Sequence, residues 1–495
     1  MKVIASLILM SFVSIRAMSQ NKPFSWGGDA EGGAPYQMPD PNNPEKIIGF
    51  EVDIAEALGK RLGMDPHFVQ QQWDGLVPGL QRGEYEAVIA GLEITQERLE
   101  KISFSSPYYY STLSMTVRLD ETRIRTPENL PTHTVGTLKA SLAERYLHEI
   151  GVTDVKTYDN QAHPYIDLIL GRLDAVVMDT PIALYYAYGQ QFLNMELPST
   201  KFPIAIGLRK DDTALLASVN DALAKMRTDG TLKDIYQRWN LYNSSTADYF
   251  GDRSPASNAN PDKYREYLAA VQTERTFGDQ LRQYLSFVPL LLRGALVTLE
   301  ISIASMALAV LLGLMLAIVR VFGNRLLAWP AVAFIEVIRG TPLLIQLFII
   351  FYGLPSLGIR LTPFWAAVIG LGLNYAAYEA ENYRAGIQAV PRGQLDAALA
   401  LGLTRTQTIR KIVLPQAVRL VIPPVTNDFI ALLKDSSLVS VITMVELTKV
   451  YGQLASTYYD YIGLGILAAL IYFLMGLPIA RLSRYVETRL AYMKV

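Results

Sequence analysis

Three residues with the chemistry of a small-molecule site stand at the ends of predicted secondary-structure elements. Arg98 follows a strand and a turn at Thr95, and a guanidinium can bind a carboxylate through two parallel hydrogen bonds. Ser141 stands at the start of a helical pattern, where backbone N–H groups and the helix dipole favour a second contact to the same carboxylate. Asp179 directly follows a short apolar strand at residues 174–178 and can accept a hydrogen bond from an ammonium group. The three residues could therefore bind one zwitterionic molecule.

Each of these residues also has a plainer interpretation. A lone arginine after a strand is more often one half of a surface ion pair, and Ser141 is more often only a helix N-cap. The order of the surrounding elements must therefore decide between the two interpretations.

The composition limits the other kinds of site. The chain has 495 residues and no cysteine, so disulfides, thiolate zinc sites and a lipidated N-terminal cysteine are excluded. The four histidines are not at metal-ligand spacing, and no Walker-type, GxSxG or HExxH motif is present. We therefore predict no metal site, no cofactor of the chain's own and no enzyme active site.

Length and hydrophobicity indicate a membrane protein of several domains. The hydrophobic residues make up 51% of the chain, which is high for a soluble protein of this length. The formal net charge of −1 argues against bulk binding to nucleic acid. We therefore expect two or more domains, part of them embedded in a membrane.

The first half alternates strands and helices. Residues 49–62 predict a helix, and residues 87–89 and 174–178 predict short strands. Two extended runs, 111–118 and 202–209, could be paired hinge strands that join two lobes, with the chain running from lobe one to lobe two and back. The pattern predicts a two-lobed α/β domain.

Several ordered motifs of this half resemble the periplasmic binding proteins for polar amino acids. They are GFEVDIAEALGKRLG, the block WDGLVPGLQRGEYEAVIAGLEITQERLEKISFSSPYY, VGTLKASLAERYL and GRLDAVVMDTPIALYY. The resemblance implies that Arg98 and Ser141 bind the ligand's carboxylate and that Asp179 binds its α-ammonium. It also implies that Tyr36 and Trp73 line the ligand's side chain.

One residue departs from that family pattern. Glu93 stands where the family commonly has Ser or Thr, and with Asp29 and Asp179 it could place three carboxylates near one pocket, against Arg98. Such an excess would favour a basic amino acid by direct attraction. Alternatively, Glu93 or Asp29 pairs with an internal Lys or Arg, for which Lys139 is available, and the ligand is neutral, such as glutamine.

The segments on either side of this domain differ in character. Residues 1–19 read as a secretory signal peptide, although Arg16 near the cleavage point leaves an uncleaved anchor as the alternative. We therefore expect residues 20–245 to form an extracytoplasmic binding domain. Residues 246–283 predict a linker followed by an amphipathic lead-in.

Residues 284–495 predict an all-α transmembrane domain. We expect five spans, at residues 295–319, about 327–354, 363–380, 418–445 and 461–480. The second begins with an interfacial or kinked piece, and the fourth is a kinked or broken helix, interrupted at Pro423–Pro424 and at Lys434–Asp435. Basic residues after the last span place the C-terminus in the cytoplasm, and five spans then place the start of this domain outside.

A basic amphipathic segment, residues 383–424, separates the third and fourth spans. Its spacing predicts two short helices with a turn at Gly402, and its positive charge predicts a cytoplasmic position. Residues 386–416 resemble the EAA loop of ABC importer permeases, with Asp396 in place of the usual Glu. The resemblance implies docking of a cytoplasmic ATPase at Asp396, Ala397, Ala398, Gly402, Leu414 and Pro415.

Ionisable residues also occur at the edges of the predicted spans. Glu336, Arg339, Glu379 and Glu381 could belong to a substrate path. A cluster that supports the ATPase dock or helix packing is the favoured alternative.

Residues 277–495 resemble an amino-acid ABC permease through FIEVIRGTPLLIQLFIIFYGLP and the segment around the loop. The resemblance implies a type I ABC importer fold, a homodimer in the plasma (inner) membrane, a polar amino acid as substrate, and two separate ATPase chains that bind ATP and Mg. A ligand-gated channel or a chemosensor with an amino-acid-binding domain are the alternatives. The binding domain is uninterrupted, no TVGYG-like filter is present, and only residues 481–495 follow the last span, so both alternatives are weaker.

Overall fold

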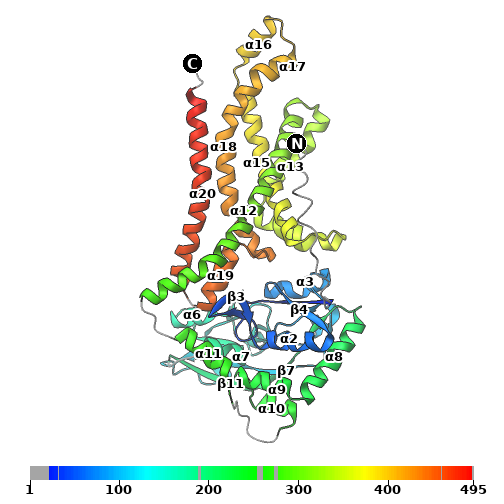
Figure 1. The fold of residues 1–495 in the computed structure, drawn as a ribbon, viewed down its shortest axis with the longest axis vertical. Coiled ribbons are helices and arrows are strands. Elements are labelled where there is room, and N and C mark those ends of the chain that lie inside the picture. Colours follow the sequence, from blue (N-terminus) through cyan, green and yellow to red (C-terminus); the bar gives the residue numbers. More distant parts are fainter. Residues whose placement is uncertain are drawn as a thin grey trace, which may run out of the picture. The chain divides into compact units, whose positions relative to one another are not determined.

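The computed structural model describes residues 22–31, 33–187, 191–252, 260–272, 277–458 and 460–492. The predicted signal peptide at residues 1–19 lies outside these residues. The chain divides into two compact units, the first made of Met1–Met38 and Ile47–Ala269 and the second of Pro39–Lys46 and Ala270–Val495 (Figure 1).

The first lobe of the first unit is built on a five-stranded sheet. Its strand order is β4-β1-β5-β12-β6, with the bounds Met64–Gln70, Lys22–Gly28, Ala87–Val88, Gly207–Leu208 and Ser103–Phe104. Strand β1 runs parallel to β4 and β5, and β12 is antiparallel to its neighbours. The helices of this lobe are α2 (Phe50–Leu62), α3 (Leu76–Arg82), α4 (Gln96–Lys101), α8 (Thr213–Thr228) and α9 (Thr231–Arg238).

The second lobe has its own five-stranded sheet. Its strand order is β11-β7-β10-β8-β9, with the bounds Phe192–Ile204, Tyr109–Arg118, Ala175–Asp179, Thr134–Leu138 and Asp154–Tyr158. Strand β8 runs parallel to β9 and β10, so their carboxyl ends meet at one edge of the sheet. The helices of this lobe are α5 (Leu142–Glu149), α6 (His163–Ile169) and α7 (Thr180–Tyr186). Strands β2 (Met38–Asp40) and β3 (Asn43–Ile48) form a separate two-stranded sheet.

Two neighbouring stretches of chain connect the lobes. The chain passes from β6 of the first sheet into β7 of the second, and it returns from β11 to β12. The start of β7 pairs with the end of β11, where Ser111 faces Phe202 and Tyr109 faces Ile204, after a register shift between Leu197 and Phe202. The predicted two-lobed α/β fold is confirmed.

Two further helices follow α9 in the chain. Helix α10 is Ser244–Phe250, and helix α11 is Asp262–Gln272, within the region predicted as linker and lead-in. The rings of Tyr264 and Tyr267 lie 5.0 and 4.9 Å from that of Tyr185 in α7. Helix α11 therefore packs on the first unit through aromatic contacts.

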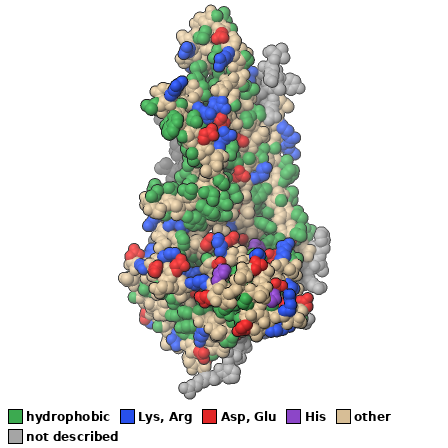
Figure 2. All heavy atoms as spheres, turned by 180° about the vertical axis from the view of Figure 1, so that it is seen from behind, with side chains coloured by type: hydrophobic (Ala, Val, Ile, Leu, Met, Phe, Trp, Pro, Cys, Tyr) green, Lys and Arg blue, Asp and Glu red, His purple; other side chains and the backbone are tan. Residues whose placement is uncertain are grey.

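The second unit is helical, as predicted. Its helices are α12 (Phe277–Phe322), α13 (Arg325–Arg339), α14 (Leu343–Phe348), α15 (Pro363–Gln388), α16 (Arg392–Ala400), α17 (Arg405–Thr408), α18 (Leu414–Asp435), α19 (Leu447–Tyr458) and α20 (Tyr461–Tyr492), joined in places by shorter helical turns. Hydrophobic side chains cover much of its visible surface, whereas charged side chains are frequent on the first unit (Figure 2). Within the described residues, α12 and α20 are long and apolar enough to cross a membrane, and the bent pair of α13 and Leu343–Leu357 is a third candidate.

The expected irregularities of the second and fourth spans are partly confirmed. The second expected span bends by 107° between α13 and the segment that starts at Leu343. In the fourth, α18 continues through Pro423 and Pro424, so of the two possibilities, a kink or a break, the break is excluded at these prolines. A proline already has a helical φ angle, and packing of α18 against α15 and α20 can offset the lost backbone hydrogen bonds. The helix instead ends at Asp435, at the second predicted break.

Candidate functional site

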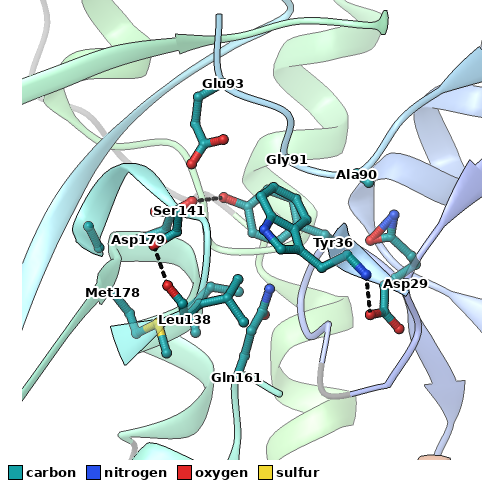
Figure 3. Close-up of a pocket in the computed structure, with 14 residues that line it drawn as sticks. Asp29, Tyr36, Ala90, Gly91, Glu93, Leu138, Ser141, Gln161, Met178 and Asp179 are labelled. Atoms are coloured by element: carbon teal, nitrogen blue, oxygen red, sulfur yellow. Dashed lines mark hydrogen bonds between the residues drawn. The ribbon is translucent and has the colours of Figure 1, made fainter. Parts of the chain in front are cut away.

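A pocket lies between the two lobes of the first unit (Figure 3). Six of the seven residues predicted to bind a ligand line it, and Arg98 lies beside it in contact with Glu93. The lining residues are Asp29, Tyr36, Gln37, Trp73, Ala90, Gly91 and Glu93 of the first lobe and Leu138, Ser141, Ala143, Gln161, Met178, Asp179 and Ile182 of the second.

Asp179 brings a carboxylate into the pocket from the second lobe. It is the last residue of β10, at the sheet edge where parallel strands end. The hydroxyl group of Tyr36 in the first lobe donates to its Oδ2 atom at 3.1 Å. Burial, followed by the neighbouring carboxylate of Glu93, raises the pKa of Asp179 well above its usual range. A bound ammonium group would lower the pKa of Asp179 again, because it favours the ionised form.

Ser141 acts as the N-cap of helix α5. Its hydroxyl group accepts from the N–H of Glu144 at 3.2 Å and donates to the carbonyl oxygen of Leu138 at 2.7 Å. The next residue, Leu142, donates its backbone N–H to Glu93 Oε1 at 3.2 Å. The start of α5 therefore already binds a carboxylate, and that carboxylate belongs to the protein.

Arg98 is held by contacts to both lobes. Its Nη1 atom donates to the carboxylate of Glu93 and, at 3.1 Å, to the carbonyl oxygen of Glu93. Its Nη2 atom donates to the carbonyl oxygen of Ala140 in the second lobe at 3.4 Å. The guanidinium carbon lies 5.3 Å from the ring centroid of Trp73, within the range of a cation–π contact.

The structure thus pairs Glu93 with an internal cation. The sequence left two possibilities for Glu93: a free carboxylate in the pocket, or a pair with an internal Lys or Arg. The structure has the pair, and the partner is Arg98. Lys139, the other cation considered, lies 3.6 Å from Asp159 and 3.9 Å from Asp74.

Asp29 follows β1, and its carboxylate accepts hydrogen bonds from N–H donors. Its Oδ1 atom accepts from the backbone of Glu31 at 3.0 Å and from the side chain of Gln70 at 2.9 Å. Its Oδ2 atom accepts from the backbone of Trp73 at 3.0 Å. Asp29 therefore orients Trp73 and also contributes negative charge to the pocket.

The sequence did not reveal several other residues of the pocket. The buried Oε1 atom of Gln161 has no hydrogen-bond partner among the described residues. Gly91 adopts a φ of 65°, and a Cβ atom there would lie 3.0 Å from the ring of Tyr36. A single glutamine in a loop carries no pattern, whereas a glycine just after a predicted strand is a usable signal for close approach.

A buried carboxylate supports this wall of the pocket from behind. Glu51 of α2 accepts from the N–H of Gly91 at 2.6 Å, from Gln37 Nε2 at 3.1 Å and from the hydroxyl group of Tyr108. Burial raises the pKa of Glu51 to about 8. Glu51 thus holds Gly91 and Gln37 in place without reaching the pocket itself.

The predicted docking segment of the second unit has a turn at Gly402, as expected. Gly402 has a φ of 83°, and its N–H donates to the carbonyl oxygen of Leu399 at 3.0 Å. Thr404 then caps α17 together with Gln407. The second helix is not short, however, because α17 continues through Ile409–Val413 into α18.

The residues predicted to dock an ATPase are mostly exposed. Asp396, Ala397, Gly402, Leu414 and Pro415 are exposed, whereas Ala398 is buried. Leu401 is 81% exposed. Leu399, two residues before it, and Leu414, at the start of α18, are exposed as well. This surface combines apolar side chains with the basic residues Arg392, Arg405, Arg410 and Lys411.

Ionisable residues of the second unit bond to one another between helices. Glu381 of α15 pairs with Arg320 of α12 and accepts from Arg384 at 2.8 Å. Asn382 donates to Asp428 of α18 at 2.8 Å. The contacts of Glu381 agree with the helix-packing alternative for that residue.

Comparison with known proteins identifies two families in the chain. Residues 28–242 match the bacterial extracellular solute-binding proteins, family 3, and residues 309–492 match the binding-protein-dependent transport system inner membrane component. The second match falls on the second unit, and the first match falls on the first unit except for Pro39–Lys46.

Individual relatives match the second half. The arginine transport system permease protein ArtQ of Bacillus subtilis (strain 168) is 37% identical over 204 residues, which cover 41% of this chain and 93% of ArtQ. The glutamine transport system permease protein GlnP of Escherichia coli (strain K12) is 37% identical over 205 residues, which cover 41% of this chain and 94% of GlnP. Among solved structures, an ancestral arginine-binding protein bound to glutamine is 31% identical and covers 46% of this chain and 100% of its own, with a TM-score of 0.42.

Proposed function

The chain belongs to the family of amino-acid ABC transporter permeases and carries its own solute-binding domain, and we propose that it captures a polar L-amino acid outside the membrane and passes it inward. It is a transport subunit that unites the binding and permease parts of an amino-acid importer. The observation that carries the proposal is the pocket between the lobes, where carboxylates and a helix N-terminus meet and a guanidinium lies beside them. The relatives are transport permeases, so the channel and chemosensor alternatives are not favoured.

We assign each pocket residue a role from its chemistry. Asp179 would accept from the ligand's α-ammonium group, because its carboxylate is the pocket anion that reaches in from the second lobe. Arg98 and the start of α5 at Ser141 would bind the α-carboxylate. Tyr36 and Trp73 would form the aromatic walls around the side chain.

The domain assignment follows from charge and hydropathy. Residues 1–19 would be the signal peptide, 20–245 the extracytoplasmic binding domain, 246–283 the linker and lead-in, and 284–495 a permease with five spans. Basic residues after the last span and in the loop at residues 386–416 support a cytoplasmic position for both. The protein would act as a homodimer in the plasma (inner) membrane, which gives one binding domain per permease.

The energy for transport would come from two separate ATPase chains. The exposed surface formed by Asp396, Ala397, Gly402, Leu414 and Pro415 offers apolar contact and positive charge to such a partner. ATP and Mg would bind to the ATPase chains and not to this chain.

Transport would proceed by alternating access. The amino acid must favour the closed lobes over the open lobes, because a ligand that binds both equally shifts nothing. The closed binding domain would engage the permease, and closure of the ATPases would move the loops around Gly402 and open the path.

A panel of amino acids tests the proposal. The full-length chain in detergent would be screened by thermal shift against the common L-amino acids, with hits confirmed by calorimetry. We expect at least one polar amino acid to bind, and binding to be lost in Arg98→Ala. The matched control is Glu100→Gln, an exposed residue on the same helix as Arg98. A wild-type protein that binds no amino acid would refute the proposed function.

A further inference from the structure

Glu93 occupies the position that the proposed function gives to the ligand's carboxylate. Its side chain is 2% exposed and lies between two donors, the guanidinium of Arg98 and the N–H of Leu142 at the start of α5. One donor belongs to each lobe. Figure 3 shows the carboxylate of Glu93 directed toward Ser141 and Asp179. A carboxylate of the protein thus already bridges the lobes where a free amino acid would do so.

A ligand carboxylate must compete with this internal pair. The carboxylate of Glu93 is tethered five residues from Arg98, so it competes without the loss of translational freedom that a free ligand incurs. A charge-assisted bond from Arg98 to the ligand can therefore form only when Glu93 gives up that bond.

We propose that binding is an exchange of ion pairs, in which the ligand's carboxylate replaces Glu93 on Arg98 and a cation in the ligand's side chain then pairs with the displaced Glu93. The inference rests on the proposed function and adds the substrate class, a basic L-amino acid. It makes Glu93 the residue that sets specificity.

Charge balance is the reason that the exchange selects a basic ligand. Glu93, once displaced, shares the pocket with Asp29 and Asp179, and Arg98 is then engaged by the ligand. A neutral amino acid brings only its α-ammonium group, which Asp179 accepts. Glu93 would then stand as a desolvated carboxylate without a cation, which is costly. A second positive charge on the ligand removes that cost.

Two other features of the pocket suit a side chain rich in N–H donors. The buried Oε1 atom of Gln161 lacks a partner among the described residues and can accept a hydrogen bond. The rings of Tyr36 and Trp73 line the same pocket and can stack on a planar guanidinium. Arginine offers five such donors and lysine three, so we expect arginine to bind more tightly than lysine.

The variant Glu93→Gln removes the internal competitor and keeps its size. Calorimetry on the full-length chain in detergent would compare arginine, lysine and glutamine. We expect glutamine to bind the variant about tenfold more tightly than wild type, and the preference for arginine over glutamine to fall by at least about tenfold. Glu100→Gln should change neither value. An unchanged arginine-to-glutamine ratio, or weaker binding of glutamine, would overturn the exchange.

A measurement on the unmodified protein gives a second test. Agmatine is arginine without its carboxylate, and it can bind while Glu93 stays on Arg98. We therefore expect agmatine to bind wild type at least about tenfold more weakly than arginine, because its guanidinium group meets a Glu93 that is still paired with Arg98. Agmatine that binds wild type as tightly as arginine would refute the exchange while leaving the amino-acid importer intact. Failure of every amino acid to bind would refute the proposed function instead.

Discussion

The two units of this chain use the same charged residue types in opposite ways. In the binding unit, Asp29, Glu93 and Asp179 face a pocket that both lobes line. In the helical unit, Glu381 and Asp428 bond to residues of neighbouring helices, and these contacts join α12, α15 and α18. Under the proposed function, carboxylates around a space select a ligand, whereas carboxylates bonded between helices hold those helices together. The comparison predicts that substitutions in the two units will separate recognition from mechanical coupling.

The largest expected effect is on ligand recognition. Asp179→Asn removes the charged acceptor for the α-ammonium group, so we expect the affinity for every amino acid to fall by about a thousandfold. Calorimetry on the full-length chain would measure this. Asp428→Asn, the comparable change in the helical unit, should leave the affinity unaltered. Equal losses in both variants would break the distinction between the two units.

The next effect concerns stability of the helical unit. Arg320→Ala leaves the largely buried carboxylate of Glu381 with fewer partners, so we expect a loss of about 3 kcal/mol in the free energy of unfolding. Thermal unfolding in detergent would follow the change. Arg325→Ala alters an exposed arginine nearby in sequence and serves as the control. Amino-acid binding should be normal in both variants, and reduced binding would contradict the comparison.

A third change targets the exposed loop. Asp396→Lys reverses a charge next to the turn at Gly402, and we expect co-purification of the ATPase partner to drop by at least about tenfold. Ligand binding and thermal stability should be those of wild type, because Asp396 is exposed. Retention of the ATPase at wild-type levels would argue that the partner docks elsewhere.

The last prediction concerns a pH dependence in the binding unit. The pKa of Glu51 is about 8 in the folded protein, above its ordinary value of 4.5, so folding takes up a proton between these values. Stability should therefore fall as pH rises through this window, by about 1.4 kcal/mol per pH unit from this one group. Glu51→Gln keeps the acceptor atom and lacks the titration. Tryptophan fluorescence at pH 5 to 9 would show a flatter dependence of the unfolding temperature, and an identical slope would exclude Glu51 as its source.

Local sequence rules predicted those features that depend on neighbouring residues. The strand that leads to Asp179, the N-cap at Ser141 and the turn at Gly402 each follow from a few adjacent residues. Packing decided the features that the sequence missed. Helix α18 continues through Pro423 and Pro424 because neighbouring helices support it, a tertiary effect that local proline rules omit.

Which charged residues of the pocket pair with each other could not be predicted from the sequence for a similar reason. Glu93 and Arg98 were both recognised as candidates, but the sequence did not indicate that they would pair with each other. That pairing needs the first lobe to place the two side chains together and the second lobe to supply Leu142. Gln161 was missed because its role depends on lacking a partner, which no sequence pattern records.

The covalent link between the binding and permease parts changes what their contact must achieve. A binding protein that diffuses freely must reach its permease by collision, and its concentration limits the rate of delivery. A domain tethered by a short connection experiences an effective concentration on the order of millimolar at the permease of its own chain. Docking can then be weak and still be nearly saturated, so the domain can leave quickly after each delivery. The fused arrangement thus suits rapid turnover even when few copies of the protein are made.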